Sequence, residues 1–385
     1  MRDNVFTNNL GYAINITNAC DISVSAIEAY GQTYSSGADI TIDQTGSMTV
    51  LNSVNCRGIA FGVGGILKIT GGGITAGTLT AGGLVTGGQP GSARMDVQNY
   101  KGLVIGTSGL NSSSTDAATN NNLTISNIGA DGITVSGQVT STRTAGSGYG
   151  HVVLNTYGSV SISNVNARGI SSYGQQDGGN ITITAGTNIT AIGSLDAVCQ
   201  EAAGYARYGG NITLVASNGT ISVKDLWSYN NSSISTYPAG NISLTAYGDI
   251  TVSGTISAKM TVTTTATNKY GQLNLTATGP GSKITVANLD LTSFRTNAAN
   301  TFDAAGSNSY ITGIISNYTS KGTNSLRLAA GQIVWYNATL AGNAYLNAAD
   351  YVMVGGGTLM HSGTVSSTRT TLPEFVNQLG YDNQL

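Results

Sequence analysis

The chain alternates apolar and polar positions over short stretches, and such stretches return about every thirty residues. Each copy holds two apolar residues that stand two positions apart, with polar residues between and after them. The clearest copies read Asn-Ile-Thr-Ile-Thr, Asn-Ile-Thr-Leu-Val and Asn-Ile-Ser-Leu-Thr at 180–184, 211–215 and 241–245. Alternation with a period of two is typical of a half-buried strand, not of a helix. A fixed repeat of this length predicts a repeat architecture.

Two further apolar features follow each copy in a constant order. A second alternating pair comes about eight residues later, and a third apolar position comes three or four residues after that. Glycine, asparagine or aspartate usually separates the first pair from the second, as tight turns require. A polar stretch of variable length then leads to the next copy. The second pairs are Ile22/Val24, Met48/Val50, Ile133/Val135, Val160/Ile162, Ile221/Val223, Ile250/Val252 and Ile284/Val286.

Three short strands in constant order predict that each repeat is one turn, or rung, of a solenoid. Equivalent strands of successive rungs would pair in parallel, and their inward residues would form apolar columns that a single repeat could not bury. We therefore expect an all-β fold, a parallel β-helix of about ten to twelve rungs with three short strands each. A β-sandwich array is the main alternative, but the constant strand order favours the solenoid.

The repeat predicts one elongated domain rather than several globular ones. We expect an N-terminal segment or partial cap at 1–12, a single β-helix at 13–365 and a C-terminal tail or cap at 366–385. The pattern weakens at 292–324, which predicts a decorated rung or an inserted loop. Because an open β-helix exposes unpaired backbone at its ends, end-to-end or lateral self-association into a filament stays open as an alternative to capping.

Composition limits the function. Charged residues make up 9% of the 385 residues and the formal net charge is −2, whereas a typical soluble domain has about 25% charged residues. This balance offers no basic surface for nucleic acid, and no apolar run is long enough to span a membrane. A surface of hydroxyls and amides favours an extracellular or cell-surface location. No apolar segment of an export signal follows Met1, so either such a signal has been removed or the chain is cytoplasmic, and we favour the first.

Two phrases carry a resemblance to a known family. The segments 210–214 and 240–254 resemble the repeats of filamentous-haemagglutinin-type proteins and of autotransporter passenger regions. The resemblance covers residues 13–290. It implies a right-handed parallel β-helix that is exported to the cell surface and serves in adhesion. Since such repeats carry no catalytic residues, the resemblance transfers none.

Polysaccharide-degrading enzymes also use β-helices, and acidic residues would carry their chemistry. Glycoside hydrolysis requires two carboxyl groups about 5 to 10 Å apart. The best acidic cluster is Asp196 and Asp225, beside the third strand of successive rungs, with Arg207 in the loop between them. Because Lys224 offers Asp225 a simple ion pair, we expect no catalytic residues and keep a polysaccharide lyase or glycosidase as the alternative. Two histidines and no Cys-x-x-Cys motif indicate neither a metal nor another cofactor.

Aromatic residues gather in the loops after the third strand. Tyrosine outnumbers phenylalanine by 19 to 5, and a ring with a polar tip suits stacking on sugars or anchoring a protein. Stacked loops would join these rings into a strip, unless the rings fold down over the flank of the rod. We therefore expect an extracellular rod whose loops bind a glycan or a host or cell-surface protein. The candidate contact residues are Tyr173, Tyr205, Tyr208, Trp227 and Tyr237.

A recurring asparagine stands at the turn into the first strand. Asn180, Asn211 and Asn241 match the glycosylation sequon, but their recurrence predicts stacked turn asparagines that bond backbone groups. His151 falls on an outward position of an equivalent strand, which predicts a surface histidine. The three cysteines stand too far apart or at unlike positions to bond, which predicts buried or partly buried thiols.

Overall fold

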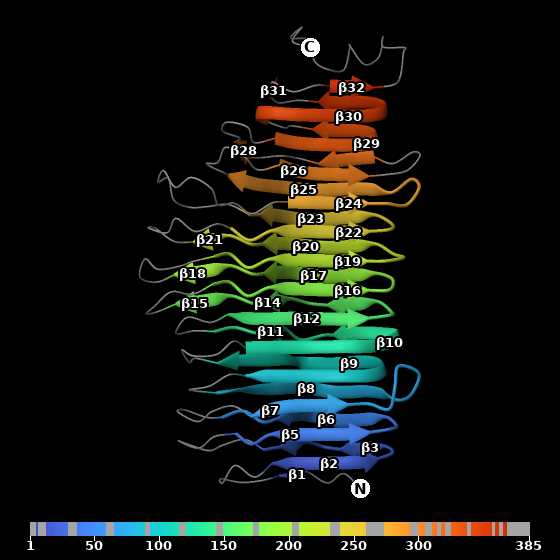
Figure 1. Cartoon of the computed structure of the whole chain (residues 1–385), viewed down its shortest axis with the longest axis vertical. Coiled ribbons are helices and arrows are strands. Elements are labelled where there is room, and N and C mark those ends of the chain that lie inside the picture. The colour runs from blue at the N-terminus through green and yellow to red at the C-terminus, as the bar shows by residue number, and fades with distance from the viewer. Residues whose placement is uncertain are drawn as a thin grey trace.

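The computed structural model is a parallel β-solenoid in which successive turns of the chain stack on one another (Figure 1). Every regular element in its described part is a β-strand. Backbone and side chains are described for residues 13–29, 37–58, 65–86, 93–114, 121–143, 149–169, 177–200, 208–229, 239–258 and 273–287. The backbone alone is described for residues 5–6, 87–88, 170–171, 201, 230–231, 288–292, 299–304, 310–313, 317–319, 325–336, 340–355, 359–361 and 365–367.

The repeated motif forms the first strand of each rung, as the alternation predicts. Each of these strands pairs in parallel with its equivalent on the next rung, so Ile181 is the Cα partner of Val152 on one side and of Ile212 on the other. The ladder runs through β2 (Ile14–Ala19), β5 (Ile40–Gln44), β7 (Ile66–Thr70), the start of β9 (Arg94–Ser114), the start of β10 (Asn121–Val135), β12 (Gly150–Thr156), β16 (Ile181–Ala185), β19 (Ile212–Ala216), β22 (Ile242–Ala246) and β24 (Leu273–Ala277).

The second and third strands form two further parallel ladders, and in several rungs one continuous strand bends through both. The third apolar position is thus Leu195 in one rung and Leu226, its Cα partner, in the next. The strands of these ladders are β3 (Ile22–Val24), β4 (Ile27–Glu28), β6 (Met48–Asn55), β8 (Thr78–Gly88), β11 (Val139–Thr140), β13 (Val160–Ile162), β14 (Val165–Asn166), β17 (Ile189–Asp196), β20 (Ile221–Trp227), β23 (Ile250–Ser257) and β25 (Lys283–Thr292), with the later parts of β9 and β10.

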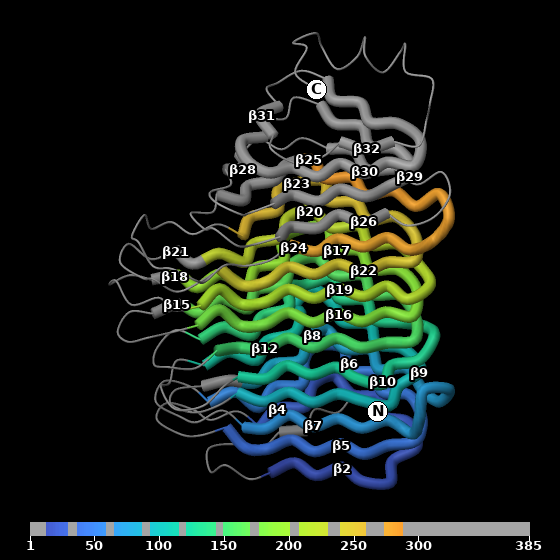
Figure 2. The backbone as a smooth tube through the Cα atoms, turned by 45° about the horizontal axis from the view of Figure 1, so that its top comes forward, coloured from blue at the N-terminus to red at the C-terminus, as the bar shows by residue number. Residues whose placement is uncertain are grey.

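The chain winds in one sense throughout the stack. In Figure 1 the N-terminus is at the bottom, first strands such as β12 and β16 point to the right in front, and second strands such as β17 and β20 point to the left behind them. A coil that rises in this way is right-handed. Figure 2 shows the same first strands following one another along the stack. The described residues include no helix long and apolar enough to cross a bilayer.

Parallel pairing continues above residue 292, where the sequence pattern is weak. The strands there are β26 (Ala299–Ala304), β27 (Tyr310–Gly313), β28 (Asn317–Thr319), β29 (Ser325–Tyr336), β30 (Leu340–Gly355), β31 (Leu359–His361) and β32 (Val365–Ser367). The predicted N-terminal cap at 1–12 lies outside the described residues apart from β1 (Val5–Phe6). The predicted C-terminal tail lies outside them beyond Ser367.

Apolar columns fill the interior. Both isoleucines of the 180–184 motif, Ile181 and Ile183, are fully buried, and so are their equivalents on the neighbouring rungs. Fully burying such a side chain stabilises the fold by about 1.5–3 kcal/mol, and stacking lets every inner rung bury its apolar residues on both sides. The hydrophobic core is therefore a continuous column along the rod axis.

Small residues occupy the corner where the chain returns from the third strand to the next first strand. Ser228 lies in this column, and its hydroxyl donates to the carbonyl of Gly210 at the entry of a first strand. The other members are Ala29, Cys56, Thr86, Ser112, Ser141, Ala167, Ala197 and Ala258, all buried. The returning chain thus packs closely against this corner, and the groove described below lies on the outside of the same turn.

A short second sheet, absent from the sequence-based prediction, extends from this corner. It contains β15 (Gly169–Ser171), β18 (Cys199–Glu201) and β21 (Asn230–Asn231), paired in parallel. Each of its strands follows the third strand of its rung, on three successive rungs, on the left in Figure 1. It therefore brings the starting points of three loops into one register.

Candidate binding groove

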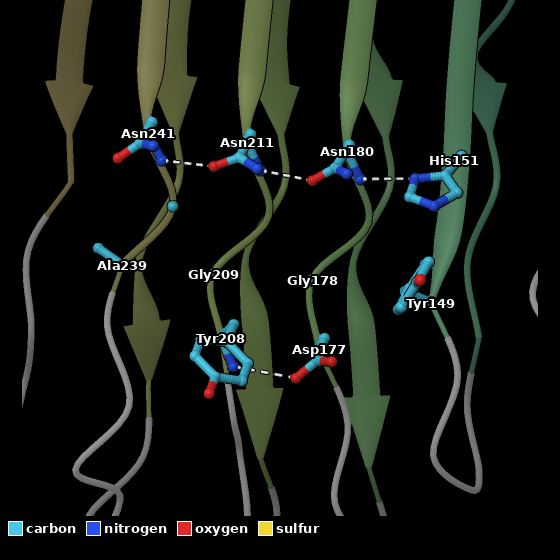
Figure 3. Close-up of a pocket in the computed structure, with 11 residues that line it drawn as sticks. Tyr149, His151, Asp177, Gly178, Asn180, Tyr208, Gly209, Asn211, Ala239 and Asn241 are labelled. Atoms are coloured by element: carbon cyan, nitrogen blue, oxygen red, sulfur yellow. Dashed lines mark hydrogen bonds between the residues drawn. The ribbon is translucent and has the colours of Figure 1, made fainter. Parts of the chain in front are cut away.

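An open groove with a volume of about 330 Å³ crosses the entries to four consecutive first strands, β12, β16, β19 and β22. Two rows of polar side chains border a row of small residues, as Figure 3 shows. One row contains His151 and the recurring asparagines, and the other contains Asp177 and Tyr208. Because the members of each row come from different rungs, the stacking of rungs creates both rows.

The asparagine row is a ladder of hydrogen bonds between rungs (Figure 3). The backbone N–H of Asn241 donates to Oδ1 of Asn211 at 2.8 Å, and the N–H of Asn211 donates to Oδ1 of Asn180 at 2.9 Å. This geometry confirms the prediction that these residues are stacked turn asparagines bonding backbone groups. With their oxygens engaged, the Nδ2 groups of Asn180 and Asn211 are available to donate outside the ladder.

His151 takes the place of an asparagine at the lower end of this row. Its Nδ1 accepts from the backbone N–H of Asn180 at 3.4 Å, so the proton of the neutral ring is on Nε2. The ring is half-buried rather than fully on the surface, and this burial lowers the pKa of His151 from its usual value of 6.5. Tyr149 packs against it edge to face, with 4.5 Å between ring centroids. The groove therefore contains an uncharged imidazole at neutral pH.

The opposite row supplies a carboxylate and a second tyrosine. The backbone N–H of Tyr208 donates to Oδ1 of Asp177 at 3.1 Å, which holds the carboxylate against the next rung. The Tyr208 side chain remains 38% exposed. Asp177 is the only acidic or basic residue, apart from the neutral His151, among the described residues that line the groove.

Glycines between the two rows keep the groove open. Gly178 and Gly209 lie between the polar rows (Figure 3). Gly210 and Gly240 directly precede Asn211 and Asn241 in the chain. A Cβ atom on Gly210 would collide with the carbonyl of Gly179, and one on Gly240 would collide with that of Gly210. Close approach of neighbouring rungs therefore requires glycine at these two positions, and Gly178, Gly209 and the small Ala239 leave the space between the rows open.

The structure places the predicted contact residues in different surroundings. Tyr208 lines the groove, whereas Trp227 lies half-buried at the end of β20, opposite Asp196 on one side and Ser257 on the other, and does not line it. Tyr173, Tyr205 and Tyr237 lie outside the described residues. The predicted aromatic strip is thus described only in part, and of its two described members only Tyr208 lines the groove.

The acidic residues of the enzyme alternative each hold the rod together. Asp196 is buried, pairs with the guanidinium of Arg168 on the preceding rung, and accepts from the backbone N–H of Val198 at 3.1 Å. This ion pair raises the pKa of Arg168. Asp225, in turn, accepts from the backbone N–H of Thr255 at 2.7 Å.

The two carboxylates also differ in register. Asp196 stands opposite Trp227, while Asp225 stands opposite Ser194. Ion pairs in the described residues join Arg168 to Asp196 and Lys101 to Asp131, not Lys224 to Asp225. Arg207 lies outside the described residues. No cluster of three potential metal ligands occurs in the part of the chain that the structure describes.

The sequence-based candidates omitted Tyr149, His151, Asp177 and the asparagine row as ligand contacts. A signal for them exists in the aligned segments 149–151, 177–180, 208–211 and 239–241, where glycine precedes each His or Asn. Aligning the repeats on this glycine places His151 with the asparagines and Asp177 with Tyr208, whereas Tyr149 aligns with Gly178 and Gly209. Comparison of the chain with protein-family models, with curated proteins and with solved structures finds no match.

Proposed function

We propose that this chain is a non-catalytic rod of the filamentous-haemagglutinin type, exported to the cell surface or beyond, which binds a glycan or a protein along one edge. The observation that carries the proposal is the groove itself. Stacking of nearly identical rungs lines up polar and aromatic side chains that no single repeat could bring together. A groove of this composition, with rings and hydrogen-bonding groups on a rigid support, suits recognition.

The proposed mechanism is display on a stiff support. Parallel ladders and continuous apolar columns fix the spacing of the rungs, so groups at equivalent positions keep their relative places without a cost in ordering on binding. The carboxylates of the enzyme alternative are already engaged with Arg168 and with the backbone of Thr255. This engagement favours a binding role over hydrolysis.

The test is binding of the purified chain to a glycan array and to an array of extracellular proteins, with release of reducing sugar measured in parallel. Tyr208→Ala should weaken binding, whereas Tyr157→Ala should not, because Tyr157 is 60% exposed but follows β12 at its other end. Release of new reducing ends, abolished by Asp196→Asn, would support the enzyme instead. Binding to neither array would contradict the proposal.

A further inference from the structure

Among its described lining residues, the groove presents several hydrogen-bond donors and a single charged group. The Nδ2 groups of Asn180 and Asn211 and the Nε2–H of His151 are donors, because the ladder engages the opposite atom of each side chain. The carboxylate of Asp177 is a strong acceptor with one oxygen held by the Tyr208 N–H. Donors interspersed with an acceptor match hydroxyl groups, which both donate and accept.

The charge of the groove selects against anions. Asp177 carries the only formal charge among the described lining residues at neutral pH, since burial keeps His151 neutral. A uronate, sulfate or phosphate group placed here would meet a carboxylate and no cation within the described lining, and like charges at contact cost binding energy. A neutral polyhydroxyl ligand meets no such repulsion.

The direction of the groove selects a linear ligand. His151, Asn180, Asn211 and Asn241 occupy the same register on consecutive rungs, and rungs repeat at the strand spacing of about 4.8 Å. A chain molecule lying along the rod axis therefore meets an equivalent polar side chain at each step. Tyr149 and Tyr208 add aromatic rings at the border (Figure 3), against which the apolar face of a sugar ring can pack.

From these three features we infer that the groove binds a neutral, linear oligosaccharide laid along the rod axis, and that it discriminates against acidic glycans. The inference rests on the proposed binding function and names its ligand class and its site. Asp177 is the residue that sets the preference for neutral over acidic chains.

Asp177→Asn tests this assignment because it removes the charge but keeps an Oδ1 acceptor for the Tyr208 N–H. We expect about tenfold weaker binding of neutral oligosaccharides, since a hydrogen bond to a charged acceptor is replaced by one to a neutral acceptor. Binding of uronate-containing oligosaccharides should rise. Asp225→Asn is the matched control, because it also keeps its backbone bond and lies away from the groove, and it should leave both affinities unchanged.

The measurement is titration calorimetry of the full chain with neutral and uronate-containing oligosaccharides of equal length. Opposite effects of Asp177→Asn on the two ligands, together with an inert Asp225→Asn, would establish the assignment. Equal affinity of the unmodified chain for both ligands, or binding that Asp177→Asn leaves unchanged, would overturn it while leaving the adhesive function in place. Binding to proteins alone would also overturn it. Absence of any binding would refute the proposed function itself.

Discussion

The backbone N–H of Asn211 donates to the side-chain oxygen of Asn180 on the preceding rung at 2.9 Å, and Asn211 in turn accepts from the N–H of Asn241 at 2.8 Å. These backbone groups stand just before a strand begins, where the parallel ladder does not yet supply them with partners. A side-chain amide at this register satisfies one such donor in each rung. This requirement explains why asparagine returns at the start of the motif.

Removing one member of the ladder should destabilise the rod locally. Asn211→Ala leaves the N–H of Asn241 without its side-chain acceptor and should lower the free energy of unfolding by about 1 kcal/mol. Asn211→Asp keeps the acceptor oxygen and should stay close to the unmodified chain. Urea denaturation of the three chains measures their free energies of unfolding and checks this order of stability. A comparable loss in Asn218→Ala, which removes an exposed turn asparagine, would contradict the explanation.

Two isoleucines in neighbouring strands offer a matched test of the apolar columns. Ile183 in β16 is fully buried, whereas Ile192 in β17 is 73% exposed. Ile183→Ala should cost about 2–5 kcal/mol, because it removes buried methyl groups and leaves a cavity between rungs. Ile192→Ala should change stability by less than about 0.5 kcal/mol. Equal losses in thermal or urea unfolding would show that Ile183 does not face the core.

The sequence predicts the strand order on most rungs whose two inward positions hold large aliphatic residues. The pairs at Leu79/Ala81 and Ile189/Ala191 also form second strands with their inward residues buried, and the predicted series lacks them. Alanine at the second position weakens the alternation that identifies a strand, although it fills the column adequately once rungs stack. The pair Leu103/Ile105, in the long strand β9, holds two large aliphatic residues, and the predicted series lacks it as well.

The groove could be predicted only in its parts. The ladder role of Asn180 follows from recurrence alone, and the structure confirms it. That His151 takes the same role, with Nδ1 as acceptor, depends on the register between rungs and on the ring orientation. Asp177 and Tyr208 meet because their rungs are adjacent, a relation between residues 31 positions apart that variable loops between them conceal.

His151 should make the rod sensitive to acid. Burial lowers the pKa of His151 in the folded chain below 6.5, so the unfolded chain binds a proton first as the pH falls. The contribution of neutral His151 to the stability of the fold is complete above pH 6.5 and is lost as the pH drops through the folded-state pKa. Protonation also removes the Nδ1 acceptor of the Asn180 N–H. The neighbouring Asp177 and Tyr149 face the same groove.

His151→Asn extends the asparagine ladder by one rung and removes this titration. As the pH falls from 7 to 5, the free energy of unfolding of His151→Asn should therefore rise relative to that of the unmodified chain. The carboxylates titrate equally in both chains, so they cancel in this difference. Urea denaturation at a series of pH values gives the difference directly. A stability difference that is constant across this range would mean that His151 does not titrate differently in the folded and unfolded chains.

The cysteines differ in exposure and should differ in reactivity. Cys56 is fully buried in the small-residue corner, its Sγ contacts the carbonyl of Gly65, and burial raises the pKa of Cys56 to about 12. Cys199 is buried as well, whereas Cys20 is exposed. Because only the thiolate is nucleophilic, iodoacetamide at pH 8 should modify the native chain at Cys20 alone.

Mass spectrometry of the labelled peptides identifies the modified site. Cys20→Ser should abolish labelling of the native chain, and denaturation in urea should expose the remaining two thiols. Labelling of Cys56 in the folded chain at a rate close to that of Cys20 would mean that the corner opens to solvent. The packing of the returning chain against the small-residue column, on which the groove depends, would then be too loose to fix the positions of its side chains.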